Sequence, residues 1–371
     1  MTESTQNRKE SNFVTTIRRH DDIFIGVDVH KRTYALTAHS RSCGFLKTIS
    51  APAEPEGLVR LLNPHAEGIR RVVYEAGPSG YKLVRTLRDA GFSADVVVTG
   101  TIPRPSTKAA KNDAIDSRTL AEFAAKDVLK YVRIPSLDQE AQREVLRTRE
   151  KAREDLTRAK NRIRMFLQQH GLPEPDGLDT WSKKAVKELG EAKLDSTDLR
   201  FCLDELLRDH DYFDKKLSAC ESRLRRVVKR KDHATGFKRL TGIPGVGLIT
   251  ASTFLLEAYS PDRFPSKREI AKYCGLSPQE HQSGDRNRRV GLSPSGNRHL
   301  RHVLIEAAWQ WVARDPNQGS RFRRLAARLG NSQKAITATA RKLSIVMWRM
   351  LIDGTDYESR PDDFSIRPSA G

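Results

Sequence analysis

Short apolar runs alternate with amphipathic stretches over residues 21–135, and the connections between them are short. Such an order predicts an α/β layer fold, in which helices and strands cover one another. Strands are expected at 23–29, 33–38, 45–50, 72–75 and 95–98, and helices at 57–62, 81–90 and 114–126. Residues 1–20, which precede this domain, are polar and predict a disordered arm.

The pattern changes over residues 136–232, where charged residues dominate and leucines recur at helical spacing. One long amphipathic helix is expected up to Gly171 and a second over 199–231, with residues 173–181 as the loop between them. Two helices of this kind predict a helical or coiled-coil region. Their loose apolar spacing fits a hairpin within one chain as well as a dimerising coiled coil.

Residues 233–355 predict a mostly helical C-terminal domain, followed by a disordered tail at 356–371. Helices are expected at 248–256, 267–274, 295–313, 318–329 and 333–352, with Trp309 and Trp311 in the core. The segment TGIPGVG at 241–247 resembles a helix-hairpin-helix element, whose Gly245 and Gly247 let backbone N–H groups approach a phosphate. A tight turn between packed helices explains these glycines nearly as well.

Charge points to the class of partner. The formal net charge is +19, and residues 233–355 carry +12 of it. This balance favours a polyanion, most commonly nucleic acid. No apolar run approaches the length of a membrane span. The four cysteines lack metal-ligand spacing, and we expect reduced thiols in a cytoplasmic protein associated with the bacterial nucleoid.

Four carboxylates stand out. Asp28 lies on the first strand, Glu75 ends another buried strand, and Asp113 and Asp116 share a face at the start of a helix. A carboxylate at the end of a buried strand is costly unless it is paired or binds a cation. Together the four predict a Mg²⁺ site, with Mn²⁺ as an alternative. Taken singly, each acid is better explained by a surface position, a helix cap or a favourable place near the helix dipole.

Three sequence blocks carrying these acids resemble a known family. They are GVDVHK at 26–31, YEAG at 74–77 and KNDAID at 111–116. They look like the signatures of the DEDD insertion-sequence transposases, which include the Piv-type DNA invertases and the bridge-RNA-guided recombinases. The resemblance implies an RNase H-like domain, as in Holliday-junction resolvases, with Lys108 and Lys111 placed to contact phosphate. The family commonly has Thr after the Ala of the Glu block, where this chain has Gly77.

A second block, at residues 275–284, resembles the transposase domain of the same family. There, a serine followed by glycine is the proposed nucleophile, and the matching residue is Ser283, with Ser293 and Ser295 as competitors. From composition alone, Ser-Gly in a flexible loop predicts only a turn. A cradle for phosphate is expected from the nearby arginines Arg286, Arg288, Arg289, Arg298 and Arg301.

These features predict a DNA transposase or site-specific recombinase that combines a metal-binding DEDD site with a serine nucleophile. Strand exchange requires more than one subunit, so a homodimer or tetramer is expected, and the resemblance implies a structured guide RNA. One alternative is a metal-dependent junction endonuclease that forms no covalent intermediate. The other is a non-enzymatic protein that binds nucleic acid through its basic surface.

Overall fold

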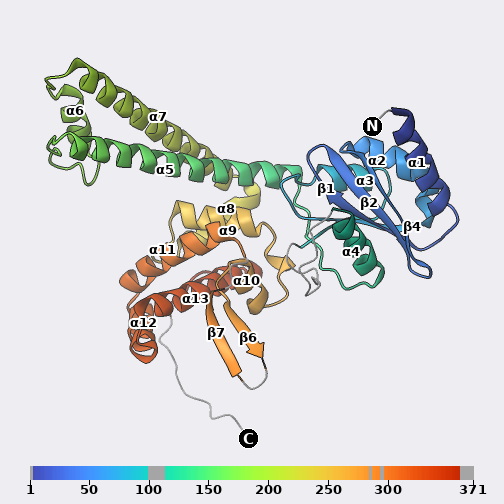
Figure 1. The fold of residues 1–371 in the computed structure, drawn as a ribbon. Helices are drawn as coiled ribbons and strands as arrows, with labels where there is room; N and C mark the ends of the chain where they lie inside the picture. The colour runs from blue at the N-terminus through green and yellow to red at the C-terminus, as the bar shows by residue number, and fades with distance from the viewer. Residues whose placement is uncertain (1–2, 99–112, 284–285, 293–295, 360–371) are drawn as a thin grey trace, which may run out of the picture. The chain divides into compact units, whose positions relative to one another are not determined.

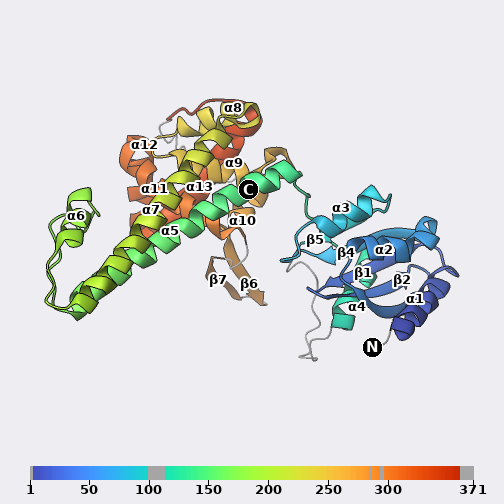
Figure 2. The same ribbon diagram turned by 90° about the horizontal axis from the view of Figure 1, so that it is seen from above.

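The computed structural model describes residues 3–98, 113–283, 286–292 and 296–359 (Figures 1 and 2). It divides into two compact units, residues 1–134 and 135–371. The helical middle and the C-terminal helices, expected as separate domains, therefore fall within one unit. The expected boundary between them, at residues 232 and 233, lies inside a helix. No helix in the described ranges has the length and apolarity needed to cross a membrane.

The first unit is built on a five-stranded sheet with the order β3-β2-β1-β4-β5. The strands are β1 (Ile23–Val29), β2 (Thr33–Ser40), β3 (Gly44–Pro52), β4 (Ile69–Glu75) and β5 (Ala94–Val97). The first three form an antiparallel meander, whereas β4 runs parallel to β1 and β5 parallel to β4. All five predicted strands are thus present, and the mixed α/β sheet domain is confirmed.

Helices cover both faces of this sheet. The helices α1 (Glu3–Ile17), α2 (Pro55–Leu62) and α3 (Lys82–Asp89) lie on one side and α4 (Asp113–Ala125) on the other, while a 3₁₀ turn, η1 (Asn63–Gly68), leads into β4 (Figure 1). Alternate residues of β1 explain the two layers. Ile25 packs into the core shared with α1, α2 and α3, and its neighbour Phe24 packs with Leu120 of α4.

The prediction of a disordered arm over residues 1–20 is wrong, because α1 is part of the sheet domain. Phe13 and Ile17 are fully buried in the core. They are four residues apart and so lie on the same face of a helix. The three apolar residues of α1, Phe13, Val14 and Ile17, are too few to reveal the helix by periodicity, but the two buried ones join it to the core of the sheet domain.

The second unit begins with a helical hairpin, which we call the arm. It consists of α5 (Leu137–Gln169), α6 (Lys183–Glu191) and α7 (Thr197–Val228), and α5 packs along α7 within one chain (Figure 2). A capping box between Ser136 and Gln139 starts α5. Both long helices were predicted, and the pairing within the chain favours the hairpin alternative. The short α6 was not predicted.

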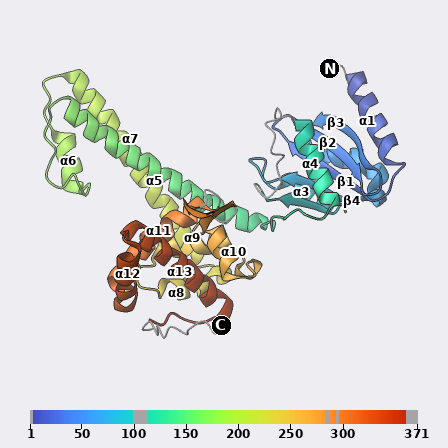
Figure 3. The same ribbon diagram turned by 60° about the horizontal axis from the view of Figure 1, so that its bottom comes forward.

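The remaining helices surround a second core (Figure 3). They are α8 (Lys231–Thr241), α9 (Leu248–Ala258), α10 (Lys267–Tyr273), α11 (Arg298–Arg314), α12 (Pro316–Leu329) and α13 (Ser332–Asp353), with a 3₁₀ turn, η2 (Pro261–Arg263), after α9. Trp311 is fully buried and Trp309 packs against the same core, so the predicted core role of both tryptophans is confirmed.

Two details of this region differ from expectation. The polar, arginine-rich segment expected as a flexible loop forms an antiparallel hairpin, β6 (Pro278–Ser283) and β7 (Arg286–Leu292) (Figure 1). The start of the expected disordered tail is ordered, because the Tyr357 hydroxyl donates to Asp315 at 2.5 Å and accepts from Trp311 Nε1. The rest of that tail, residues 360–371, lies outside the described residues.

Candidate functional site

Asp28 and Glu75 lie side by side at one edge of the sheet. Val27 of β1 is the register partner of Tyr74 in the parallel strand β4. Asp28 and Glu75 are each one residue further on, so they occupy equivalent positions at the carboxyl ends of neighbouring strands, on the same face. Both side chains are partly buried. The pairing of β1 with β4 thus brings together two acids that are 47 positions apart in the sequence.

The face that carries Asp28 is the one covered by α4. Gly26, two residues earlier on the same face, lies directly beneath this helix. A Cβ atom there would overlap the carbonyl oxygen of Ser117 and come within 2.6 Å of the amide nitrogen of Ala121. The Ser117 hydroxyl, fully buried, also contacts the Thr37 hydroxyl of β2 at 2.8 Å. Glycine at position 26 is therefore what lets α4 sit on the strands.

The direction of α4 brings its acidic start towards Asp28. Leu120 and Ala124 pack with Phe24, whereas Ser117 lies over Gly26, so the helix runs antiparallel to β1. Two strand residues advance about 6.6 Å and four helical residues about 6 Å. Two residues further along β1, Gly26 is followed by Asp28. Four residues back along α4 from Ser117 lies the first turn of the helix, which contains Asp113 and Asp116.

One partner of Asp28 is His30, which lies two residues further along the chain. The His30 Nε2 and Asp28 Oδ2 atoms are 3.2 Å apart. Among the side chains that the structure describes, no three His, Cys, Asp or Glu residues form a metal-binding group. The side chain of Asp113 lies outside that set, as do Lys108 and Lys111.

Ser283 is the last residue of β6. Its backbone register partner is Arg286 on β7, and His281 is paired with Arg288 in the same ladder. The hairpin thus brings the candidate nucleophile next to the arginine-rich strand, which also contains Arg289. The residues between the strands, 284–285, and the two competing serines, Ser293 and Ser295, lie outside the described residues. The hairpin was not predicted, although the dipeptide Gly284-Asp285 is typical of a two-residue hairpin loop.

The two glycines of the TGIPGVG turn differ in their surroundings. Gly245 has φ of +89°, and a Cβ there would lie 2.6 Å from Gln310 Cβ and 2.9 Å from the Trp311 amide nitrogen. Its close approach is to α11, which supports the tight-turn explanation for this residue. Gly247 precedes α9 as its N-cap, and a Cβ there would meet no atom of the described residues within 4 Å.

The arginines at the start of α11 also differ. Arg298 is exposed. Arg301 is only partly exposed and lies against Gly275, where a Cβ would come within 2.8 Å of its Nε. Gly275 has φ of +66°, so both the close contact and the backbone favour glycine. Arg298 is therefore better placed for a ligand than Arg301.

A buried carboxylate missed by the sequence reasoning organises this unit. Glu257 on α9 has no exposed side-chain surface and accepts from Arg143 at 3.2 Å and Arg147 at 3.4 Å. It also accepts from Asn297 Nδ2 at 2.8 Å, and Asn297 in turn caps α11. A lone glutamate within the apolar helix α9 was the available signal, since a buried charge needs partners.

Comparison with known proteins identifies the class of enzyme as a transposase. A DEDD-type transposase model matches residues 25–171, which include the acidic sheet edge. The model described as "Transposase IS116/IS110/IS902 family" matches residues 237–323, which include the hairpin and the start of α11. The chain belongs to this IS110-related family of transposases.

Similarity to individual relatives extends over most of the chain. It is 29% identical to the putative transposase y4qE of Sinorhizobium fredii, over 88% of both chains. It is 26% identical to the transposase for insertion sequence element IS1111A of Coxiella burnetii, over 77% of this chain and 79% of that one. A similar match, at 26% identity and 68% of this chain, is the transposase for IS1328 of Yersinia enterocolitica.

Proposed function

We propose that this transposase cuts and rejoins DNA of a mobile element with a site made of two parts. The first part is the acidic set Asp28, Glu75, Asp113 and Asp116, and the second is Ser283 on the β6–β7 hairpin. The observation that carries the proposal is the pairing of Asp28 and Glu75 on neighbouring parallel strands beneath α4. The sheet order, with its antiparallel meander followed by two parallel strands, supports an RNase H-like fold for this domain.

The acidic set fits a divalent metal. Asp28, Glu75 and Asp116 are partly buried oxygen donors, which suit Mg²⁺ or Mn²⁺. When bound, such an ion neutralises charge on the phosphate oxygens that react. Asp28 and Glu75 would hold it from the sheet, and Asp116 with Asp113 from α4. His30, bonded to Asp28, would keep that carboxylate oriented.

The serine supplies the covalent step. Ser283 Oγ loses its proton and forms a bond to phosphorus, while the bond from phosphorus to the sugar oxygen of the broken strand is cleaved. That sugar oxygen takes up a proton and leaves as a hydroxyl, so the phosphodiester energy is retained for rejoining. Arg286, Arg288 and Arg289 share the hairpin with Ser283 and would balance charge on the transferring phosphate.

The test is to trap the protein–DNA adduct. The full chain is incubated with Mg²⁺ and duplex DNA carrying the element's ends, then denatured and analysed for DNA linked to protein. We expect the adduct to be lost in Ser283→Ala and retained in Ser293→Ala, a matched serine control. Asp28→Asn should lose adduct and cleavage while still binding DNA.

Two results would overturn the proposal. Metal-dependent cleavage that never yields an adduct would indicate a junction-type nuclease. Binding without cleavage, indifferent to chelator and to Asp28→Asn, would indicate a nucleic-acid-binding protein that is not an enzyme.

We also propose that the working assembly is a dimer or tetramer and that a structured RNA helps to choose its targets. The basic C-terminal region supports a nucleic-acid partner, since residues 233–355 carry +12 of the +19 net charge. Mass measurement of the chain with and without DNA tests the assembly. Sequencing of RNA that co-purifies with the chain tests the guide, and recovery of random cellular RNA alone would contradict it.

A further inference from the structure

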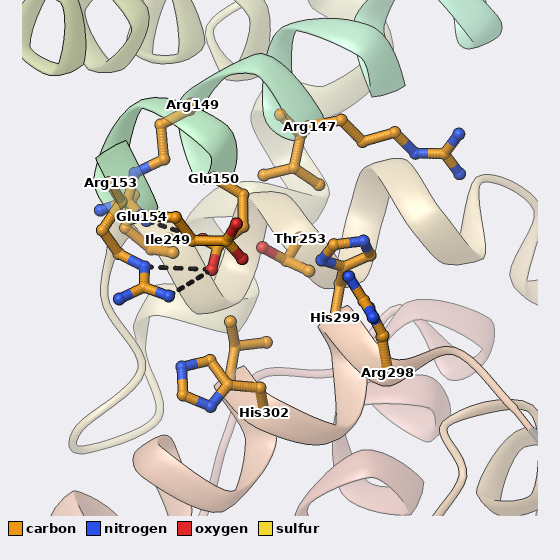
Figure 4. A pocket seen from close by; sticks show the side chains of 12 residues that line it. Arg147, Arg149, Glu150, Arg153, Glu154, Ile249, Thr253, Arg298, His299 and His302 are labelled. Carbon is orange, nitrogen blue, oxygen red and sulfur yellow. Dashed lines mark hydrogen bonds and ion pairs between the residues drawn. The ribbon is translucent and has the colours of Figure 1, made fainter. Parts of the chain in front are cut away.

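A pocket of about 330 Å³ lies between the arm helix α5 and the C-terminal helices α9 and α11 (Figure 4). On the α11 side it is lined by Arg298, His299 and His302. Thr253 of α9 lies at its centre, and Arg153 is among the α5 residues that face it. None of the groups that we assign to the proposed catalytic chemistry lines this pocket. We call it the α5–α11 pocket.

The lining is rich in positive charge. It contains four arginines against two glutamates, an excess of two positive charges before either histidine is protonated. One of the acids, Glu150, is already engaged, because Arg153 donates to it at 2.7 Å and Arg149 at 3.3 Å. Hydrogen bonds and charge from Arg153 hold the pKa of Glu150 below its usual value, against the effect of burial. Three of the four arginines already pair with carboxylates, Arg149 and Arg153 with Glu150 and Arg147 with Glu257, so the charge offered to a ligand is chiefly that of Arg298.

The α11 side of the pocket offers donors that the protein does not use. Within the described part of the chain, the side chains of Arg298, His299 and His302 make no hydrogen bond or ion pair. Arginine presents a planar fork of N–H groups that matches two oxygens of one phosphate. Each imidazole adds at least one N–H donor, whichever form it takes.

Glu257 links the two walls of the pocket. This buried carboxylate binds Arg147, which also lines the pocket from α5. It binds Asn297 as well, the residue that caps α11 immediately before Arg298. The donors of α5 and α11 are thus held in one arrangement before any ligand binds, which reduces the entropy cost of binding.

We propose that the α5–α11 pocket binds a phosphodiester group of a nucleic-acid backbone, with Arg298 as its principal donor. This inference rests on the proposed function, since it takes the nucleic acid handled by the enzyme as the ligand. The pocket offers cations and N–H donors, and these recognise phosphate without reading sequence. It thereby fixes a strand across the junction of the arm and the C-terminal helices.

The experiment measures the affinity of the full chain for labelled nucleic acid by fluorescence anisotropy over a range of salt concentrations. The probes are a 30-base-pair DNA duplex and an RNA hairpin of the same length. Arg298→Ala is compared with Arg314→Ala, an exposed arginine at the other end of the same helix and outside the pocket. The two variants change net charge equally. Arg298→Lys tests whether charge alone suffices.

For Arg298→Ala we expect roughly 5- to 20-fold weaker binding and a salt slope smaller by about one, whichever sequence is used. Arg298→Lys should keep most of the salt slope but lose part of the affinity, and Arg314→Ala should stay within about twofold of the parent chain. Loss confined to the DNA probe or to the RNA probe identifies which strand the pocket holds.

Equal behaviour of Arg298→Ala and Arg314→Ala, in a chain that binds nucleic acid, overturns the pocket assignment and leaves the proposed function standing. Failure of the parent chain to bind either probe overturns the proposed function itself. Because Arg298 is exposed and has no ion pair among the described side chains, its variants should melt at the parent temperature, and a melting curve of each variant separates a folding defect from the expected loss.

Discussion

The two units of this transposase hold their functional groups in different ways. In the sheet unit, backbone hydrogen bonds between β1 and β4 fix Asp28 and Glu75, and close packing at Gly26 fixes α4 above them. In the helical unit, a buried charge holds the helices in place, because Glu257 of α9 contacts Arg143 and Arg147 of α5 and the cap of α11. A strand register is kept or lost as a whole, because a slip of one residue moves every side chain to the other face of the sheet. A buried charge cluster instead depends on the presence of each charged partner.

The location of the tryptophans makes this comparison measurable. All four, Trp181, Trp309, Trp311 and Trp348, belong to the helical unit. Tryptophan fluorescence therefore follows unfolding of that unit alone, while far-ultraviolet circular dichroism follows both. The predictions below run from the largest expected effect to the smallest.

Glu257→Ala should destabilise the helical unit by about 3–5 kcal/mol, since it removes the buried carboxylate that binds both Arg143, only 13% exposed, and Arg147. Denaturant unfolding followed by tryptophan fluorescence measures the loss. Glu306→Ala on α11, an exposed glutamate, is the control and should change little. Similar stability of both variants would mean that packing, rather than Glu257, holds the arm to the C-terminal helices.

Gly26→Ala should destabilise the sheet unit by about 2–3 kcal/mol, because the added Cβ meets the backbone of α4 and cannot be accommodated by a side-chain shift. The gain from restricting the unfolded chain is smaller, about 0.4–1 kcal/mol. Circular dichroism should register the change while the tryptophan transition stays in place. Gly77→Ala serves as control, because among the described residues its Cβ would approach the Glu75 carbonyl oxygen alone, at 3.9 Å.

A shift of the tryptophan transition in Gly26→Ala would contradict the independence of the two units. Unchanged circular dichroism would contradict the close packing of α4. If α4 is displaced as expected, DNA cleavage should fall as well, since the helix carries Asp113 and Asp116.

Asn297→Ala should cost about 1–2 kcal/mol, more than the matched cap variant Asn331→Ala at about 1 kcal/mol. Both asparagines cap a helix of the same unit, but only Asn297 also donates to Glu257. Thermal melting followed by fluorescence compares them. Equal losses would mean that the hydrogen bond from Asn297 to Glu257 adds no stability and that Asn297 acts as a helix cap alone.

The smallest effect concerns acid stability of the arm. Burial lowers the pKa of His210, and nearby Lys160 lowers it further, while the ring stacks on Trp181 at 4.8 Å. The unfolded chain thus binds a proton more readily, so the arm should lose stability as pH falls through about 6.5, the unfolded value. His210→Phe keeps the stack and should lessen this loss. Melting temperatures at pH 7.5 and 5.5 test this prediction. An equal loss of stability at low pH in the parent chain and in His210→Phe would mean that a group other than His210 causes it.

Sequence reasoning succeeded where structure follows a local period. Every strand of the sheet and most helices were predicted, because apolar residues recur at intervals of two or of three to four. It failed at α1, in which apolar residues are sparse although Phe13 and Ile17 are buried, and at the β6–β7 hairpin, whose polar strands lack apolar alternation. In both cases residues elsewhere in the chain provide the packing or the strand pairing that the local pattern does not indicate.

By itself, the sequence determined the α/β order of the first unit, the strand-end positions of Asp28 and Glu75, and the concentration of positive charge in the last third. These are local properties of composition and period. Only the tertiary structure decided that Gly26 receives α4, that Gly245 packs on α11, and that Glu257 gathers Arg143, Arg147 and Asn297. Those contacts join residues 40 to 114 positions apart, and no local pattern encodes which distant partner a buried charge or a glycine will meet.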